Sequence, residues 1–93
     1  MEIKARLWPD TPTHPGELLA DELEARQVSA PTACEVLDLS ATELDELLQG
    51  RRSLSARVAW RLETLFDDIS ARFWMGLQAD FDLATERLKQ AAG

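Results

Sequence analysis

Apolar residues recur every three or four positions in five separate stretches of the chain, a spacing that places them on one face of a helix. The stretches predict helices at about 15–26, 30–38, 41–49, 56–67 and 71–90. Each predicted helix is apolar on one side only, and the last is the longest and the richest in aromatic side chains. We therefore expect an all-α domain of five helices, the last of them long, packed around a single core.

Local signals at the helix ends agree with these ranges. Four serines stand directly before predicted helices, where a hydroxyl can accept from free backbone N–H groups: Ser29, Ser40, Ser55 and Ser70. The stretch 40–43, Ser-Ala-Thr-Glu, has the pattern of a capping box. In the stretch 14–17, His-Pro-Gly-Glu, a proline suits the first helical position and an acid suits the positive end of the helix dipole. Gly50 is placed to end the third helix.

Only three residues, 38–40, separate the second predicted helix from the third. So short a turn forces the two helices to cross steeply, which favours a helix-turn-helix over an antiparallel hairpin. Close packing there needs small residues in the middle of the second helix, where Ala33 and Cys34 stand, and apolar residues after the turn, where Leu39 and Leu44 stand. A plain bundle of small helices is the alternative that this pattern leaves open.

The first thirteen residues follow a different pattern. Apolar residues alternate with basic ones over 3–7, and Pro9 and Pro12 then interrupt any helix. We interpret residues 1–13 as an N-terminal arm or short strand, with a disordered terminus as the alternative, and residues 14–93 as one domain.

Charge complicates a role in nucleic-acid binding. The chain has 93 residues, 45% of them hydrophobic and 29% charged, which is the balance of a folded globular domain. Its formal net charge of −7 favours a basic partner. Phosphate neutralisation supplies most non-specific affinity for DNA, so a DNA-binding protein of this composition needs a local basic patch.

Residue types that support catalysis or metal binding are scarce. Cys34 is the single cysteine and His14 the single histidine, so we expect no intrachain disulfide, no metal site and no cofactor. Cys34 is interpreted as a small core residue and His14 as part of the start of the first helix. No glycine-rich phosphate loop or nucleophile–base pair stands out, so an enzyme is not expected. The chain also lacks a long apolar run, and we expect a cytoplasmic protein with no membrane segment.

Three segments of the chain resemble those of one known family. They read HPGELL at 14–19, LDELLQGRRSLSA at 44–56 and ARFWMGLQADFDL at 71–83. In order and spacing they are similar to the HPGE, NGRRxISA and FWLNLQxxYDL segments of HigA antitoxins. The likeness spans about residues 13–88 and implies a lambda-repressor-like helix-turn-helix domain.

The resemblance also implies two partners and a set of contact residues. A HigA-type homodimer would place its third helix in the major groove of its own operator and would neutralise a small basic ribonuclease toxin. Base-reading side chains would then stand at Ala41, Thr42, Asp45 and Glu46. Backbone phosphates would be bound at Ser29, Arg51 and Arg52. Ser40, at the start of the third helix, belongs to the same predicted DNA-binding surface.

The chain departs from the family pattern mainly on that surface. Ala41 stands where arginine or glutamine is common, and the stretch 41–52 holds three carboxylates against two arginines. We therefore expect weak DNA binding, although a carboxylate such as Glu46 can accept from cytosine N4. The alternative to phosphate contact is that Arg51 and Arg52 are simply a pair of solvated side chains in a loop. Asp38 stands where the turn usually has glycine, and aspartate tolerates the left-handed conformation better than most residues.

Aromatic and leucine side chains of the last helix are candidates for a dimer interface: Phe73, Trp74, Leu77 and Phe81. A place in the core is the alternative for Trp74 and Phe81, and Trp60 could take either role. The sequence thus predicts an antitoxin that also represses its own operon. The alternative is a protein-only interaction module that keeps the helix-turn-helix fold with weak or lost DNA binding.

Overall fold

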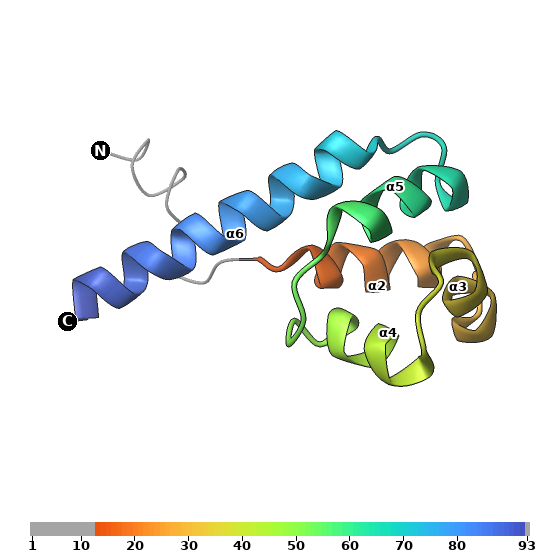
Figure 1. The fold of residues 1–93 in the computed structure, drawn as a ribbon, viewed down its shortest axis with the longest axis horizontal. Coiled ribbons are helices and arrows are strands. Elements are labelled where there is room, and N and C mark those ends of the chain that lie inside the picture. Colours follow the sequence, from red (N-terminus) through yellow and green to blue (C-terminus); the bar gives the residue numbers. More distant parts are fainter. Residues whose placement is uncertain (1–12, 93) are drawn as a thin grey trace.

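The computed structural model describes residues 13–92 and contains five helices over that range (Figure 1). They are α2 (Pro15–Ala25), α3 (Ala30–Leu37), α4 (Ala41–Leu48), α5 (Ala56–Leu65) and α6 (Ala71–Ala92). Every predicted helix is present, and its ends lie within two residues of those expected, so the all-α prediction is confirmed. The predicted arm lies outside the described residues except for Thr13.

The core lies where the five helices meet. Helix α6 packs on α5 and α2, α3 packs on α5 and α4, and α2 packs on α4. Among the described residues, twelve hydrophobic side chains form the buried core: Leu19, Leu23, Ala33, Leu37, Leu44, Leu47, Leu54, Val58, Ala59, Leu62, Phe66 and Trp74. Trp74 was assigned to the dimer interface with the core as its alternative, and it is fully buried within the chain. Its indole ring therefore has no surface to offer to a second copy.

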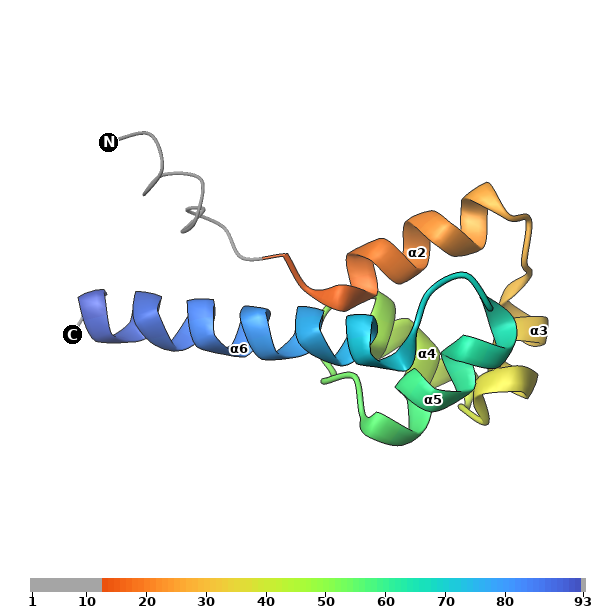
Figure 2. The ribbon, with the colours of Figure 1, turned by 90° about the horizontal axis from the view of Figure 1, so that it is seen from above.

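Helix α6, with 22 residues, is the longest helix in the described range. Its N-terminal half lies against the other helices, and its C-terminal half extends beyond them (Figure 2). Two leucines on the extended half, Leu83 and Leu88, are about half exposed at 49% and 46%. An exposed helix with apolar side chains of this size is a surface on which another chain could pack.

The start of α2 explains the His-Pro-Gly-Glu segment. The His14 Nδ1 atom accepts from the Gly16 backbone N–H at 2.9 Å, and the Glu17 carboxylate accepts from the His14 N–H at 3.3 Å. This is a capping box with histidine in the place of serine. Gly16 also allows α2 to approach α4, because a Cβ at this position would collide with the Leu47 carbonyl. The interpretation of His14 as part of the helix start is confirmed.

Candidate nucleic-acid interface

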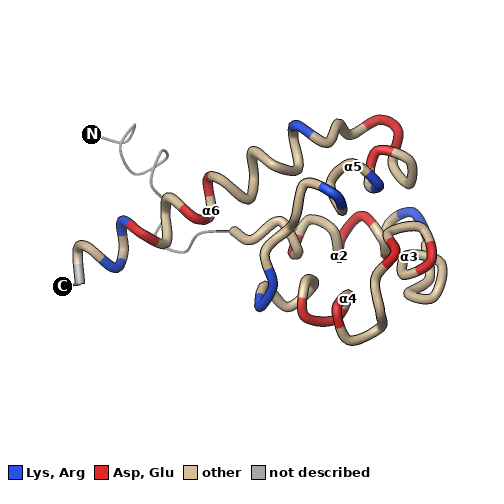
Figure 3. Tube along the Cα trace, in the orientation of Figure 1, with Lys and Arg blue, Asp and Glu red and all other residues tan. Residues whose placement is uncertain are grey.

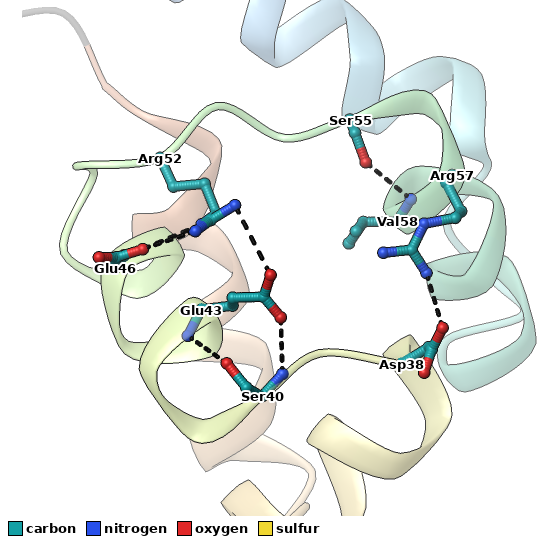
Figure 4. A network of polar contacts seen from close by, with 8 residues as sticks. All are labelled: Asp38, Ser40, Glu43, Glu46, Arg52, Ser55, Arg57 and Val58. Carbon is teal, nitrogen blue, oxygen red and sulfur yellow. Dashed lines mark hydrogen bonds and ion pairs between the residues drawn. The ribbon is translucent and has the colours of Figure 1, made fainter.

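The turn between α3 and α4 has the geometry of a helix-turn-helix. Asp38 takes the left-handed conformation (φ 56°, ψ 51°), which glycine adopts most easily and aspartate tolerates. Beyond the turn, the Ser40 hydroxyl accepts from the Glu43 N–H at 3.0 Å, and the Glu43 carboxylate accepts from the Ser40 N–H at 2.8 Å (Figure 4). The predicted capping box is therefore present, and Asp38 supports the turn without glycine.

The eight residues predicted to contact DNA come together on or near α4. Ala41, Thr42 and Asp45 are exposed along this helix, and Glu46 is partly buried. Ser29 and Ser40 cap the starts of α3 and α4. Their hydroxyl oxygens therefore already accept hydrogen bonds from the helix backbone.

Arg51 and Arg52 follow α4, and both are paired with carboxylates of that helix. Arg52 contacts Glu46 at 2.8 Å and Glu43 at 3.9 Å, and Arg51 lies 3.7 Å from Asp45 (Figure 4 shows the Arg52 contacts). All three acids of the predicted recognition helix thus have an arginine partner. The count of charges along 41–52 did not show that these carboxylates and arginines face one another.

A third arginine on this side was missed by the sequence analysis. Arg57 lies in the first turn of α5 and contacts Asp38 in the turn at 3.2 Å (Figure 4). A cation at the positive end of a helix dipole is unfavourable unless an anion is close. The position of Arg57 two residues after the capping Ser55 was therefore a usable signal for a nearby anion.

Hydrogen bonds and charges keep Glu43 in its anionic form. Its pKa is lowered from the ordinary value, first by the hydrogen bond from the Ser40 backbone and then by the Ser40 hydroxyl. The positive charges of Arg52 and Arg57 act in the same direction. Glu43 thus carries a full negative charge at neutral pH and remains a partner for Arg52.

The loop that carries Arg51 and Arg52, residues 49–55, is held by α6 and by the start of α2; we call it the arginine loop. Within it, Gly50 has a positive φ of 75° and lies against the His14 ring. The buried amide of Gln78 accepts from the Leu54 N–H at 2.7 Å and donates to Asp82 at 2.9 Å. The backbone of the loop is thereby fixed from inside the protein.

His14 completes this support. Its imidazole ring packs edge-on against Phe81 at 4.8 Å between ring centroids, and Gly50 of the loop lies beside it. Burial lowers the pKa of His14, although the Arg52 backbone, Asp82 and Glu17 oppose the shift. The three sequence segments that carried the family resemblance therefore meet at the arginine loop. Gln78 and Asp82 were not predicted as part of the site, although their spacing of four residues on a helix was an available signal.

Charge is unevenly distributed over the described part of the chain (Figure 3). Acidic residues gather on α4 and on the loop between α5 and α6, and basic residues gather on the arginine loop and α5. Within residues 13–92 no cluster of three or more His, Cys, Asp or Glu side chains is suited to a metal ion. In the same range no helix has the length and apolar character needed to span a bilayer.

These features define a helix-turn-helix protein of the lambda-repressor-like kind. Pseudomonas aeruginosa antitoxin HigA, solved with the higBA promoter, has 38% sequence identity and a TM-score of 0.78, over 87% of this chain and 88% of that one. A HigA-family antidote protein from Coxiella burnetii has 32% identity and the same TM-score, over 88% and 89% of the two chains. The chain belongs to the HigA antitoxin family.

Two further relatives were found among curated proteins. Virulence-associated protein A′ of Dichelobacter nodosus is 36% identical over 73 residues, which cover 78% of this chain and 64% of that protein. The helix-turn-helix regulator YbaQ of Escherichia coli K12 is 34% identical over 73 residues, or 77% and 64% of the two chains. The chain thus spans slightly less than two thirds of the length of these two relatives. No family model matches the sequence.

Proposed function

We propose that this chain is the antitoxin of a toxin–antitoxin module and that it represses its own operon by placing α4 in the major groove of operator DNA. The main support is the likeness to Pseudomonas aeruginosa HigA bound to the higBA promoter, at 38% identity over 87% of this chain. A second Pseudomonas aeruginosa structure of equal identity and TM-score contains an 18-bp operator. The exposed side of α4 and the supported arginine loop are the local features that fit this role.

We assign phosphate contacts to residues that precede and follow α4 in the sequence. Arg51 and Arg52 would bind phosphates after α4, and we add Arg57 at the start of α5. The N-termini of α3 and α4, at Ser29 and Ser40, would direct backbone N–H groups and positive dipole ends toward the DNA backbone. These contacts position the protein without reading sequence.

Base reading is assigned to the exposed residues of α4. Ala41 can make an apolar contact with a thymine methyl group, and Thr42 can hydrogen-bond to a base edge. Asp45 and Glu46 can accept only, so cytosine N4 and adenine N6 are their natural targets. An acidic reading helix of this kind would select few sequences and bind them weakly.

The partner proposed for the antitoxin role is a small basic ribonuclease. The net charge of −7 favours a basic protein, and the acidic surfaces of the described residues lie partly away from the arginine loop. We also propose a homodimer through α6, because two recognition helices about 34 Å apart fit successive major grooves. Phe73, Leu77 and Phe81 remain the proposed contact residues, without Trp74.

A protein-only interaction module is the second candidate. It is favoured by one observation, that the arginines next to α4 are each paired with a carboxylate of the same chain. In that case the fold would serve protein contacts alone.

Titration with DNA separates the two candidates. Binding of the wild-type protein to its own upstream region and to a random-sequence duplex is measured by fluorescence anisotropy at several salt concentrations. The double variant Arg51→Ala, Arg52→Ala should reduce the slope of log affinity against log salt by roughly one unit per lost phosphate contact, nearly equally for both duplexes. Binding to the toxin should persist. The control Arg72→Ala removes an exposed arginine from α6 and should leave the slope unchanged.

Two results would contradict these assignments. Unchanged slopes in the double variant would remove Arg51 and Arg52 from the interface. Absence of DNA binding, with toxin binding retained, would favour the protein-only module. Loss of the preference for the upstream region in Thr42→Ala would support the assignment of base reading to α4.

A further inference from the structure

We propose that Glu46, assisted by Glu43, occupies Arg52 as an internal substitute for a DNA phosphate and so lowers the affinity of the chain for DNA of any sequence. This inference rests on the proposed DNA-binding function. It assigns to the carboxylates of α4 a role that is separate from base reading.

The contact geometry resembles that of an arginine on a phosphate. The Nε and Nη2 atoms of Arg52 both donate to the Oε1 atom of Glu46, at 3.1 and 2.8 Å. Its Nη1 atom lies 3.9 Å from the Oε2 atom of Glu43, on the other side of the guanidinium (Figure 4). A guanidinium uses the same planar set of N–H donors for carboxylates and phosphates. Glu46 therefore occupies the Nε and Nη2 edge of the guanidinium, one of the edges with which arginine binds a phosphate, and Glu43 adds a negative charge beside Nη1.

The exposure of this cluster allows exchange. The side chains of Arg52, Glu43 and Glu46 are 42%, 40% and 34% exposed, so water and ions reach the pair and weaken it. An exposed pair of this kind competes with a phosphate but does not prevent it from binding.

Arg26, in the turn after α2, makes more contacts within the chain than Arg52 does. It makes two hydrogen bonds to Asp68, at 2.7 and 2.8 Å, and one to Glu22 at 2.8 Å. Its guanidinium also lies over the Phe66 ring, 4.7 Å from the centroid. That set of contacts joins α2 to the loop before α6 and leaves few donors available for another ligand.

Exchange of Arg52 onto DNA has an electrostatic consequence. The carboxylates that it leaves, Glu46 and Glu43, then stand unpaired near the phosphates and attract cations from solution. Fewer ions are released overall than the number of arginine–phosphate contacts would predict, so the salt dependence of affinity becomes shallower. Arg51 with Asp45, and Arg57 with Asp38, repeat the arrangement on a smaller scale, each with one contact.

The test compares two variants that change the net charge equally. Glu46→Gln keeps the shape of the side chain and removes its charge beside Arg52. Glu24→Gln makes the same charge change on the exposed surface of α2. A random-sequence duplex is the probe, because the inference concerns DNA of any sequence. Fluorescence anisotropy is recorded between about 50 and 200 mM salt, the range over which phosphate contacts change affinity strongly.

We expect Glu46→Gln to bind the random duplex about three- to tenfold more tightly than wild type, with a salt slope steeper by up to roughly one unit. Glu24→Gln should change affinity by less than about twofold, because a distant exposed charge is screened. Glu43→Gln is an independent second variant, since glutamine preserves the capping box, and it should act in the same direction. Thermal unfolding followed by circular dichroism checks that each variant is folded.

The possible outcomes separate this inference from the proposed function. If Arg52→Ala makes the slope shallower but Glu46→Gln behaves like Glu24→Gln, the inference is overturned and DNA binding stands. If Glu46→Gln weakens binding to the chain's own upstream region and leaves random DNA unchanged, Glu46 reads a base and the inference is also overturned. If neither wild type nor Glu46→Gln binds any duplex, both the inference and the proposed repressor role fail. If Glu46→Gln binds the random duplex and the wild type does not, the inference is supported in its strongest form.

Discussion

Gly16 stands where α2 crosses α4, and its missing side chain allows the crossing. A Cβ at this position would collide with the Leu47 carbonyl, which belongs to helix backbone and cannot rotate away. Gly76, in α6, has nothing within 4 Å of the place where a Cβ would lie. The two glycines therefore differ in what a methyl group would meet.

Replacement of each glycine by alanine tests this difference. Gly16→Ala should lower the free energy of unfolding by about 3 kcal/mol, the upper part of the usual range for overpacking. Gly76→Ala should raise it by about 0.5 to 1 kcal/mol, because alanine is the better helix former. Urea denaturation followed by circular dichroism measures both values. Similar effects in the two variants would show that the α2–α4 crossing tolerates a side chain.

His14 makes stability depend on pH. Burial lowers its pKa from the ordinary value of 6.5, so the folded chain holds the proton less tightly than the unfolded chain does. The stabilising contribution of neutral His14 is therefore complete above pH 6.5 and is lost as the pH falls below that value through the folded-state pKa. His14→Asn keeps a helix-capping side chain and removes the titration.

We expect the melting temperature of the wild type to fall between about pH 7 and pH 5, and that of His14→Asn to change less over this interval. Differential scanning calorimetry at several pH values measures both. Glu43 and Asp68, whose pKa values are lowered, lose their contributions only at more acidic pH and are common to both proteins. Parallel pH profiles would rule out His14 as the source.

At the scale of the helices, α6 does more than close the core. Its residue Gln78 reaches the arginine loop and accepts from the Leu54 N–H, while Asp82, one turn further along α6, holds the amide in place. The loop has no regular secondary structure of its own to satisfy its backbone groups. One of its contacts therefore comes from Gln78, which lies twenty-four residues after Leu54 in the sequence.

Removal of the Gln78 amide should affect both stability and DNA binding. Gln78→Leu has a similar volume but leaves the buried Leu54 N–H without an acceptor, which should cost about 2 kcal/mol of unfolding free energy. The loosened arginine loop should bind DNA several-fold more weakly. Gln90→Leu, on the exposed end of α6, is the control and should change neither. Full DNA affinity in Gln78→Leu would show that the loop holds its shape without α6.

At the scale of the whole molecule, α6 leaves apolar side chains in water in both of its halves. Phe73 and Leu83 are both 49% exposed, although they lie at different places on the helix. Phe73 and Leu77 are one turn apart on one side of α6, where the sequence predicted a dimer contact. Leu83 points to another side of the helix and offers a matched control.

We expect the chain to be a dimer at tens of micromolar when measured by multi-angle light scattering. Phe73→Glu should weaken association at least about tenfold, because a charge would be buried without a partner in the interface. Leu83→Glu should leave the mass unchanged. A monomeric wild type would contradict the proposal, and dissociation by Leu83→Glu alone would move the interface to the other side of α6.

The sequence alone determined where the helices begin and end and how α3 turns into α4. Those features depend on contacts between residues three or four apart, such as the box formed by Ser40 and Glu43, and on the three-residue turn at 38–40. Periodicity showed which residues face inward, but it did not distinguish the core of one chain from the surface of a dimer. For that reason Trp74 was assigned to an interface although it is buried in the monomer.

Only the tertiary structure decided how the candidate site is assembled. Arg57 and Asp38 are nineteen residues apart, and Gln78 is twenty-four residues from Leu54, so no local pattern relates them. Composition showed more acids than bases near α4, which predicted repulsion from DNA. The fold instead brings each of those acids to an arginine, because the loop after α4 returns along the helix. Charge counted along a sequence does not show which charges face one another, and that arrangement depends on the packing of the whole chain.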